Sequence, residues 1–175
     1  QRREENRVLV DFVRVIAVLP ISEQIPRERY TPGDRIKVYV VSVSSTIKGP
    51  EILVSRSHPD MVRMVFESEI PEMASGAIEI KGISREAGAR SKVAVVAHQD
   101  SIDPIGSCIG QRGSRIQTII SELGGEKIDV ILYNEDSEVF IANALSPAKV
   151  ISISLNDEER KALVTVKDDQ LSLAI

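Results

Sequence analysis

The first 57 residues alternate apolar and polar positions in short runs that are separated by turn residues. Period-two alternation is typical of strands with one buried face. It predicts strands over residues 7–13, 14–20, 35–44 and 51–55. Thr31-Pro32-Gly33-Asp34 and Lys48-Gly49-Pro50 supply the proline and glycine that tight turns favour. Short strands with this punctuation predict a small antiparallel barrel over residues 1–57.

Residues 58–147 change to a mixture of helical and strand periods. A helix is expected from Ser57-His58-Pro59-Asp60 to Ile70-Pro71. The elements expected after it are strands at 77–85 and 91–98, helices at 103–109 and 115–123, a strand at 127–133 and a helix at 137–145. This order predicts an α+β domain whose sheet packs one face against the helices.

Residues 148–175 repeat the pattern of that domain in coarse form. Strands are expected at 150–155 and 162–166, with the opening of a helix at 169–175. In both 103–109 and 169–175, an aspartate leads seven residues that end in isoleucine. Only the first copy is followed by Gly110, so we expect the start of a second, similar domain that stops before its loop.

The stretch Gly110-Gln111-Arg112-Gly113, between two predicted helices, is the most informative part of the chain. Glycine lacks a Cβ, so the backbone can approach a phosphate closely, and the next helix presents N–H groups and a positive dipole end to it. Arg112 and Arg115 add positive charge. The unit of helix, GxxG and helix is the mark of a KH domain, which clamps single-stranded nucleic acid. A tight turn between packed helices would fit the four residues alone equally well.

The amino-acid composition limits which side chains could contact nucleic-acid bases. Aromatic residues make up 3% of the chain and tryptophan is absent, so the aromatic stacking platform of an RRM is excluded. Base contacts are expected from aliphatic side chains and backbone groups instead.

The charge distribution favours a short, local nucleic-acid binding site over binding to any polyanion regardless of its sequence. The formal net charge is −4. Residues 1–57 carry ten Lys/Arg and seven Asp/Glu, whereas residues 58–147 carry eight and fourteen. Positions 81–115 are nevertheless locally basic. Their cations are Lys81, Arg85, Arg90, Lys92, Arg112 and Arg115.

Cysteine and histidine content argues against catalysis and metal binding. The single Cys108 excludes a disulfide within the chain, and a buried structural role is expected for it. His58 and His98 stand forty residues apart without a nucleophile in a recognisable frame. No apolar run is long enough to span a bilayer. We therefore expect a non-enzymatic, cytoplasmic protein with no cofactor, no membrane partner and no small-molecule substrate.

Longer blocks of sequence carry a family resemblance. The segments "VSRSHPDMVRMVFESEIPEMASGAIEIKGISREAGARSKVAV", "DPIGSCIGQRGSRIQTIISELGGEKIDVI" and "FIANALSPAKV" resemble the NusA family of bacterial transcription factors. The segments "AVLPISEQ", "GDRIKVYVV" and "LVSRS" resemble the second half of the OB-type RNA-binding barrel first described in ribosomal protein S-one.

The resemblance implies a multidomain chain. Its parts would be a partial OB-type barrel (residues 1–57), a prokaryotic, type II KH domain (58–147) and the start of a second KH domain (148–175). The implied partners are single-stranded RNA, RNA polymerase and other transcription elongation factors, in pausing, termination and antitermination. The polymerase-binding N-terminal domain of the family is expected to be absent from these residues.

Carried over residue by residue, the resemblance implies an RNA site around the GxxG loop. The clamp would be Gly110, Gln111, Arg112 and Gly113, with Ser114 and Arg115 opening the next helix. The base groove would be walled by Ile105, Ile109 and Ile116, with backbone groups from residues 128–132. Lys81, Arg85 and Arg90 are further candidates, although this strip would fit the opposite face as well.

Other interpretations stay open at this point. Arg14, Arg35, Lys37 and Arg56 are candidate backbone contacts on the barrel, but charges on exposed strands are more often solvated. The chain would also suit an RNA-binding appendage of an exoribonuclease, although KH precedes barrel in that class. A third interpretation is a protein-docking module with an acidic KH surface.

Overall fold

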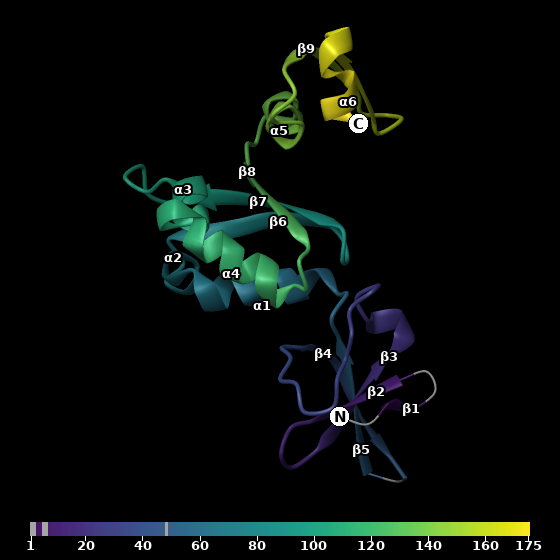
Figure 1. Cartoon of the computed structure of the whole chain (residues 1–175). Helices are drawn as coiled ribbons and strands as arrows, with labels where there is room; N and C mark the ends of the chain where they lie inside the picture. Colours follow the sequence, from purple (N-terminus) through teal and green to yellow (C-terminus); the bar gives the residue numbers. More distant parts are fainter. Residues whose placement is uncertain (1–2, 5–6, 48) are drawn as a thin grey trace.

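The computed structural model of the chain describes residues 3–4, 7–47 and 49–175. Its elements form three consecutive parts, which Figure 1 shows from the β-rich N-terminal part, through a central sheet with helices, to a smaller C-terminal part. The central part lies between the other two, so its two ends each meet a neighbour.

The N-terminal part is a five-stranded sheet. Its strands are β1 (Arg3–Glu4), β2 (Arg7–Asp11), β3 (Ile16–Pro20), β4 (Tyr39–Thr46) and β5 (Gly49–Ser55). The strand order β1-β2-β3-β5-β4 leaves the sheet open at β1 and β4. The inward side chains alternate along the strands, as the sequence pattern predicted. The buried core consists of Val8, Val10, Ala17, Leu19 and Val54. The β-rich region agrees with the predicted OB-like fold, with a sheet that does not close.

Two details of the predicted barrel are wrong. β3 pairs in parallel with β5, with Ala17 opposite Ile52, whereas only antiparallel pairs were expected. The long connection through η1 (Ile21–Glu23) and residues 24–38 returns the chain before β4, so β5 runs in the same direction as β3.

The strands predicted at 7–13 and 14–20 are each shorter, because residues 12–15 form the turn between them. Val13 N donates to Asp11 Oδ1 at 2.7 Å and Phe12 N donates to Val15 O at 2.9 Å. The turn predicted at 31–34 is present, with Asp34 N donating to Thr31 O at 3.1 Å. In the turn predicted at 48–50, Lys48 lies outside the described residues, and Gly49 and Pro50 already belong to β5.

The central part follows the element order predicted for a KH domain up to its third strand, with one short additional helix at residues 71–74. It runs α1 (Pro59–Glu69), α2 (Pro71–Ala74), β6 (Ile78–Glu86), β7 (Arg90–Ala97), α3 (Pro104–Ile109), η2 (Gln111–Gly113), α4 (Ser114–Glu122) and β8 (Lys127–Leu132). The sheet order is β6-β7-β8; β7 is antiparallel to β6 and parallel to β8.

One face of this sheet packs on the helices. The apolar stripe of α1 and the inward residues of α3 and α4 meet alternate residues of β6 and β7. The buried cluster consists of Met61, Val62, Val65, Phe66, Ile70, Met73, Ile78, Ile80, Val93, Val95, Cys108, Ile119 and Leu123. Because these helices are short, burial of their apolar side chains is the main contribution to their stability.

The C-terminal part contains α5 (Ser137–Ala144), the antiparallel pair β9 (Val150–Asn156) and β10 (Lys161–Val166), η3 (Asp168–Gln170) and α6 (Leu171–Ala174). The series α5, β9, β10, α6 repeats α1, β6, β7, α3. We predicted α5 as the last helix of the first KH domain. It lies beyond the end of β8 and beside the C-terminal elements (Figure 1), where Asn143 Nδ2 donates to Leu132 O at 3.0 Å.

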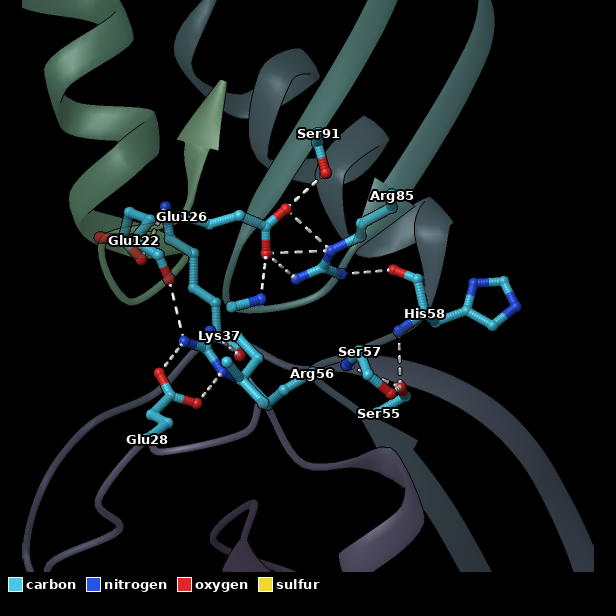
Figure 2. Close-up of polar contacts among 12 residues, drawn as sticks. Glu28, Lys37, Ser55, Arg56, Ser57, His58, Arg85, Ser91, Glu122 and Glu126 are labelled. Atoms are coloured by element: carbon cyan, nitrogen blue, oxygen red, sulfur yellow. Dashed lines mark hydrogen bonds and ion pairs between the residues drawn. The ribbon is translucent and has the colours of Figure 1, made fainter. Parts of the chain in front are cut away.

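Arg56 joins the barrel to the central part. Its side chain is 3% exposed, and it is surrounded by acceptors from three segments (Figure 2). Arg56 Nε donates to Glu28 Oε2 at 3.0 Å, and the other nitrogens reach Glu28 Oε1, Lys37 O at 2.9 Å and Glu122 O at 3.0 Å. The planar guanidinium satisfies all of these acceptors at once. The two parts are therefore held together by a buried polar contact.

Candidate nucleic-acid interface

The GxxG loop has a backbone that requires its glycines. Gly110 has φ 73° and ψ 174°, a region that is almost exclusive to glycine, and Gly113 is left-handed with φ 76° and ψ 14°. Arg112 between them is also left-handed, with φ 54°. Gly113 N donates to Gly110 O at 3.1 Å, which closes a single tight turn. The sequence motif is thus a compact reversal between α3 and α4.

This reversal presents polar groups to solvent. The side chains of Gln111, Arg112 and Ser114 are exposed. The N-cap of α4 is Gly113, which has no side chain to cap the first N–H groups of that helix. An open hollow lies beside it, lined by Asp103, Gly106, Ser107, Gly110, Gln111, Ser114 and Arg115. Backbone N–H groups and a positive dipole end at such a hollow suit an anion such as a phosphate.

Arg115 occupies a different position from Arg112. Its NH1 donates to Glu72 Oε2 at 2.9 Å and to Ser107 O at 2.8 Å, and its side chain is 33% exposed. The pKa of the Glu72 carboxyl lies below its usual value, because its own backbone N–H and then Arg115 donate hydrogen bonds to it while desolvation opposes them. Glu72 could not be identified from the sequence, because its partner is 43 residues away.

The three isoleucines expected to wall a groove differ in exposure. Ile105 and Ile116 are partly buried and pack against the central core. Ile109, the last residue of α3, is 40% exposed. The predicted backbone donor, β8, is the edge strand of the sheet, so its outer edge pairs with no other described strand. α3 and α4 both contact β8, which brings the isoleucines and this edge to one side of the domain.

Lys81 and Arg90 lie on the other face of the sheet. They alternate along β6 and β7 with the buried residues Ile80 and Ser91, and so point away from the helices. Each already has an acidic partner: Lys81 Nζ is 3.0 Å from Glu79 Oε2, and Arg90 Nε is 2.8 Å from Asp129 Oδ2. The structure does not bring these two cations to the GxxG loop.

Arg85 is a buried structural residue rather than a free cation. Its side chain is 1% exposed and pairs with the fully buried Glu126, with NH2 2.9 Å from Oε2 (Figure 2). Glu126 also accepts from Gly88 N at 2.9 Å and from Ser91 Oγ, while Arg85 NH1 donates to His58 O at 2.7 Å. The candidacy of Arg85 as an RNA contact is therefore wrong, because its side chain is buried and paired with an acid inside the protein.

The four basic residues predicted as RNA contacts on the barrel also differ in exposure and in their partners. Arg14 and Arg35 are exposed. Lys37 Nζ is 3.4 Å from Glu69 Oε1 and 3.8 Å from Glu122 Oε2, so it bridges to the central helices. Arg56 is the buried junction residue described above. The interpretation of Arg56 as an RNA contact is wrong for the same reason as that of Arg85.

Cys108 and the histidines have the structural surroundings predicted for them. Cys108 is fully buried, and burial raises the pKa of its thiol to about 12. His58 Nδ1 accepts from Asp60 N at 3.1 Å and caps α1. His98 is exposed beside Glu79. The described residues contain no group of three or more His, Cys, Asp or Glu side chains arranged to hold a metal ion.

Helix lengths and hydropathy bear on membrane association. No helix in residues 3–4, 7–47 and 49–175 has the length and apolar character needed to cross a membrane.

Comparison with known families divides the KH-like region in two. Residues 56–133 match the NusA-like first KH domain, and residues 137–175 match the NusA-like second KH domain. The boundary predicted from the sequence lies between residues 147 and 148. In the family division, α5 belongs with the second match, in keeping with the structural repeat of helix, strand, strand and helix.

Curated relatives match the chain along its whole length. The transcription termination/antitermination protein NusA of Halalkalibacterium halodurans is 49% identical over 100% of this chain and 46% of its own length. The proteins of the same name from Bacillus subtilis and Thermus thermophilus are 48% and 54% identical, over 100% and 99% of this chain and 47% and 45% of their own. The chain therefore spans a little under half the length of these relatives.

Proposed function

Because the chain belongs to the NusA family, we propose that it binds single-stranded RNA as part of a transcription termination and antitermination factor. The observation that supports this most directly is the GxxG loop, in which two glycines with positive φ open the N-terminus of α4 to solvent. The family match gives the loop the context that a four-residue motif lacks.

The proposed mode is binding without catalysis. One RNA phosphate would lie against the backbone of residues 110–114, with Arg112 adding mobile positive charge. Bases would lie against Ile105, Ile109 and Ile116 and exchange hydrogen bonds with the free edge of β8. Arg112, unlike Arg115, has no acidic side chain within ion-pair distance among the described residues, so its charge is free for this purpose.

The wider role follows from the relatives and is part of the same proposal. RNA polymerase and other elongation factors are the expected protein partners, and the cytoplasm is the expected location. In this role, the chain would bind nascent RNA and thereby regulate pausing, termination and antitermination by RNA polymerase.

Binding of a short labelled single-stranded RNA at several salt concentrations tests the proposal. We expect a Gly110→Asp, Gly113→Asp double variant to lose affinity at least about tenfold, because it places two carboxylates where a phosphate would lie. Gly76→Asp is the matched control: Gly76 also has a positive φ of 77°, and nothing lies within 4 Å of an added Cβ. It adds charge and backbone strain in the same domain, away from the loop.

A second variant tests the contribution of Arg112. We expect Arg112→Ala to make the dependence of log affinity on log salt shallower by about 0.7, the slope of one phosphate contact on a single strand. Undiminished binding by the folded double aspartate variant would contradict the assignment of RNA to this loop and would favour protein docking.

A further inference from the structure

Arg115 crosses the GxxG loop and ties three elements together. Its aliphatic stem covers Gly110 so closely that a Cβ there would be 2.8 Å from Arg115 Cγ. Its guanidinium continues to Ser107 O, on α3, and to the carboxylate of Glu72, on α2. One side chain from the first turn of α4 thus connects the loop to α3 and to α2.

The two acceptors make Arg115 an internal brace. Ser107 O is one of the last carbonyls of α3, which lack partners within the helix. A cation at this end also interacts favourably with the negative end of the helix dipole. α3 has only six residues and depends on such outside contacts. Since NH1 of Arg115 donates to both Ser107 O and Glu72 Oε2, this nitrogen is already engaged with acceptors of the protein.

We propose that Glu72 is a positioning residue for RNA binding: through Arg115 it holds the GxxG loop in the shape that receives a phosphate. This inference rests on the proposed function of that loop. The inference goes beyond that function in two ways. It assigns a role in RNA binding to Glu72, an acid outside the motif, and it makes Arg115 a brace instead of a phosphate contact.

The direction in which Glu72→Gln changes RNA affinity distinguishes the two possible roles of Arg115. If Arg115 contacts phosphate, Glu72→Gln removes a negative charge from the site and frees the arginine, so RNA affinity rises. If Glu72 positions the loop, the same substitution lowers the fraction of loops in the binding shape, and RNA affinity falls. Glu67→Gln, on an exposed part of the neighbouring α1, is the matched control for loss of an acid.

The experiment measures affinity for a short single-stranded RNA at several salt concentrations. We expect Glu72→Gln to weaken binding about two- to fivefold and Arg115→Ala about tenfold. The double variant should bind no worse than Arg115→Ala, because the two residues act as one unit. All three should keep the salt slope of the wild type. Tighter binding by Glu72→Gln, or a slope that is shallower by about 0.7 in Arg115→Ala, would overturn the proposal.

Amide hydrogen exchange without RNA provides an independent readout. Exchange of the amides of residues 110–114 should accelerate in Glu72→Gln and stay unchanged in Glu67→Gln. Unchanged exchange in Glu72→Gln would overturn the brace even if RNA binding changed. If Gly110→Asp, Gly113→Asp left RNA binding intact while Glu72→Gln still loosened the loop, the proposed function would fail and the brace would stand.

Discussion

At the scale of single residues, the two loop glycines perform different tasks. Gly110 combines a glycine-only backbone region with close contact to Arg115, whereas Gly113 is left-handed and an added Cβ would meet only Ile116 Cγ2, at 3.9 Å. A left-handed alanine is strained by about 1 kcal/mol, and more strain is expected where a neighbour must also move.

This difference predicts an order of effects for two alanine variants. Gly113→Ala should lower the free energy of unfolding by about 1 kcal/mol and leave RNA affinity within about twofold of the wild type. Gly110→Ala should cost about 2 kcal/mol or more and weaken RNA binding several-fold, because Arg115 must leave its place over the loop. Urea unfolding and RNA titration measure the two quantities. Equal effects of the two variants would contradict the distinct roles.

At the scale of elements, the buried pair of Arg85 and Glu126 connects β6, the turn before β7 and the entry to β8. Both side chains are almost completely buried, and Glu126 accepts five hydrogen bonds from Arg85, Gly88 and Ser91. Removing one partner of such a pair leaves an uncompensated charge in the interior.

We therefore expect Glu126→Gln to lower the free energy of unfolding by about 3 kcal/mol. Glu159→Gln is the control, because its pair with Lys161 is exposed (57% and 73%) and should contribute less than about 0.5 kcal/mol. Urea denaturation of both variants provides the comparison. A loss below about 1 kcal/mol in Glu126→Gln would mean that the pair does not hold the elements as inferred.

The elements themselves were largely predictable because their boundaries are local. His58 and Pro59 begin α1, Asp103 and Pro104 begin α3, and the two glycines at 124 and 125 both have positive φ where α4 ends. The parallel pairing of β3 and β5 was not predictable in this way, since the direction of β5 depends on the long connection at residues 21–38, whose only regular element is the short η1.

The candidate site was predictable to a smaller extent. The loop and its walls follow from a contiguous stretch, but the state of each cation depends on residues far away in sequence. Arg85 and Arg56 look like Arg112 in sequence, and only their partners, Glu126 and Glu28, separate buried arginines from free ones. Glu126 directly follows Gly124-Gly125 and precedes a predicted strand, and no neighbour in sequence explains an acid at this position. This was the only local sign in the sequence that Glu126 has a distant partner.

At the scale of the whole molecule, Arg56 makes the barrel and the central domain cooperate. Its four acceptors lie in the barrel loop, in the segment before β4 and at the end of α4. Ile25 packs close to the same junction: a Cβ on Gly88, in the turn between β6 and β7, would be 2.8 Å from Ile25 Cγ2. Opening of one part should therefore expose surface on the other.

We expect Arg56→Lys to uncouple the two parts, because an ammonium cannot reach all the acceptors of a planar fork. Stability should fall by about 2 kcal/mol, and the amides of β2 and β3 should exchange faster while those of β7 remain protected. Arg14→Lys, at an exposed position, is the control. Equal acceleration in both parts would indicate that they still open together.

The chemistry of the Arg56 junction also bears on the evolution of modular proteins. The barrel loop offers Arg56 the carboxylate of Glu28, whereas α4 offers it the backbone carbonyl of Glu122. A backbone carbonyl is present whatever residue occupies that position. The contact of Arg56 with α4 therefore tolerates substitution at position 122, whereas the neighbouring pairs of Lys37 depend on the acidic side chains of Glu69 and Glu122.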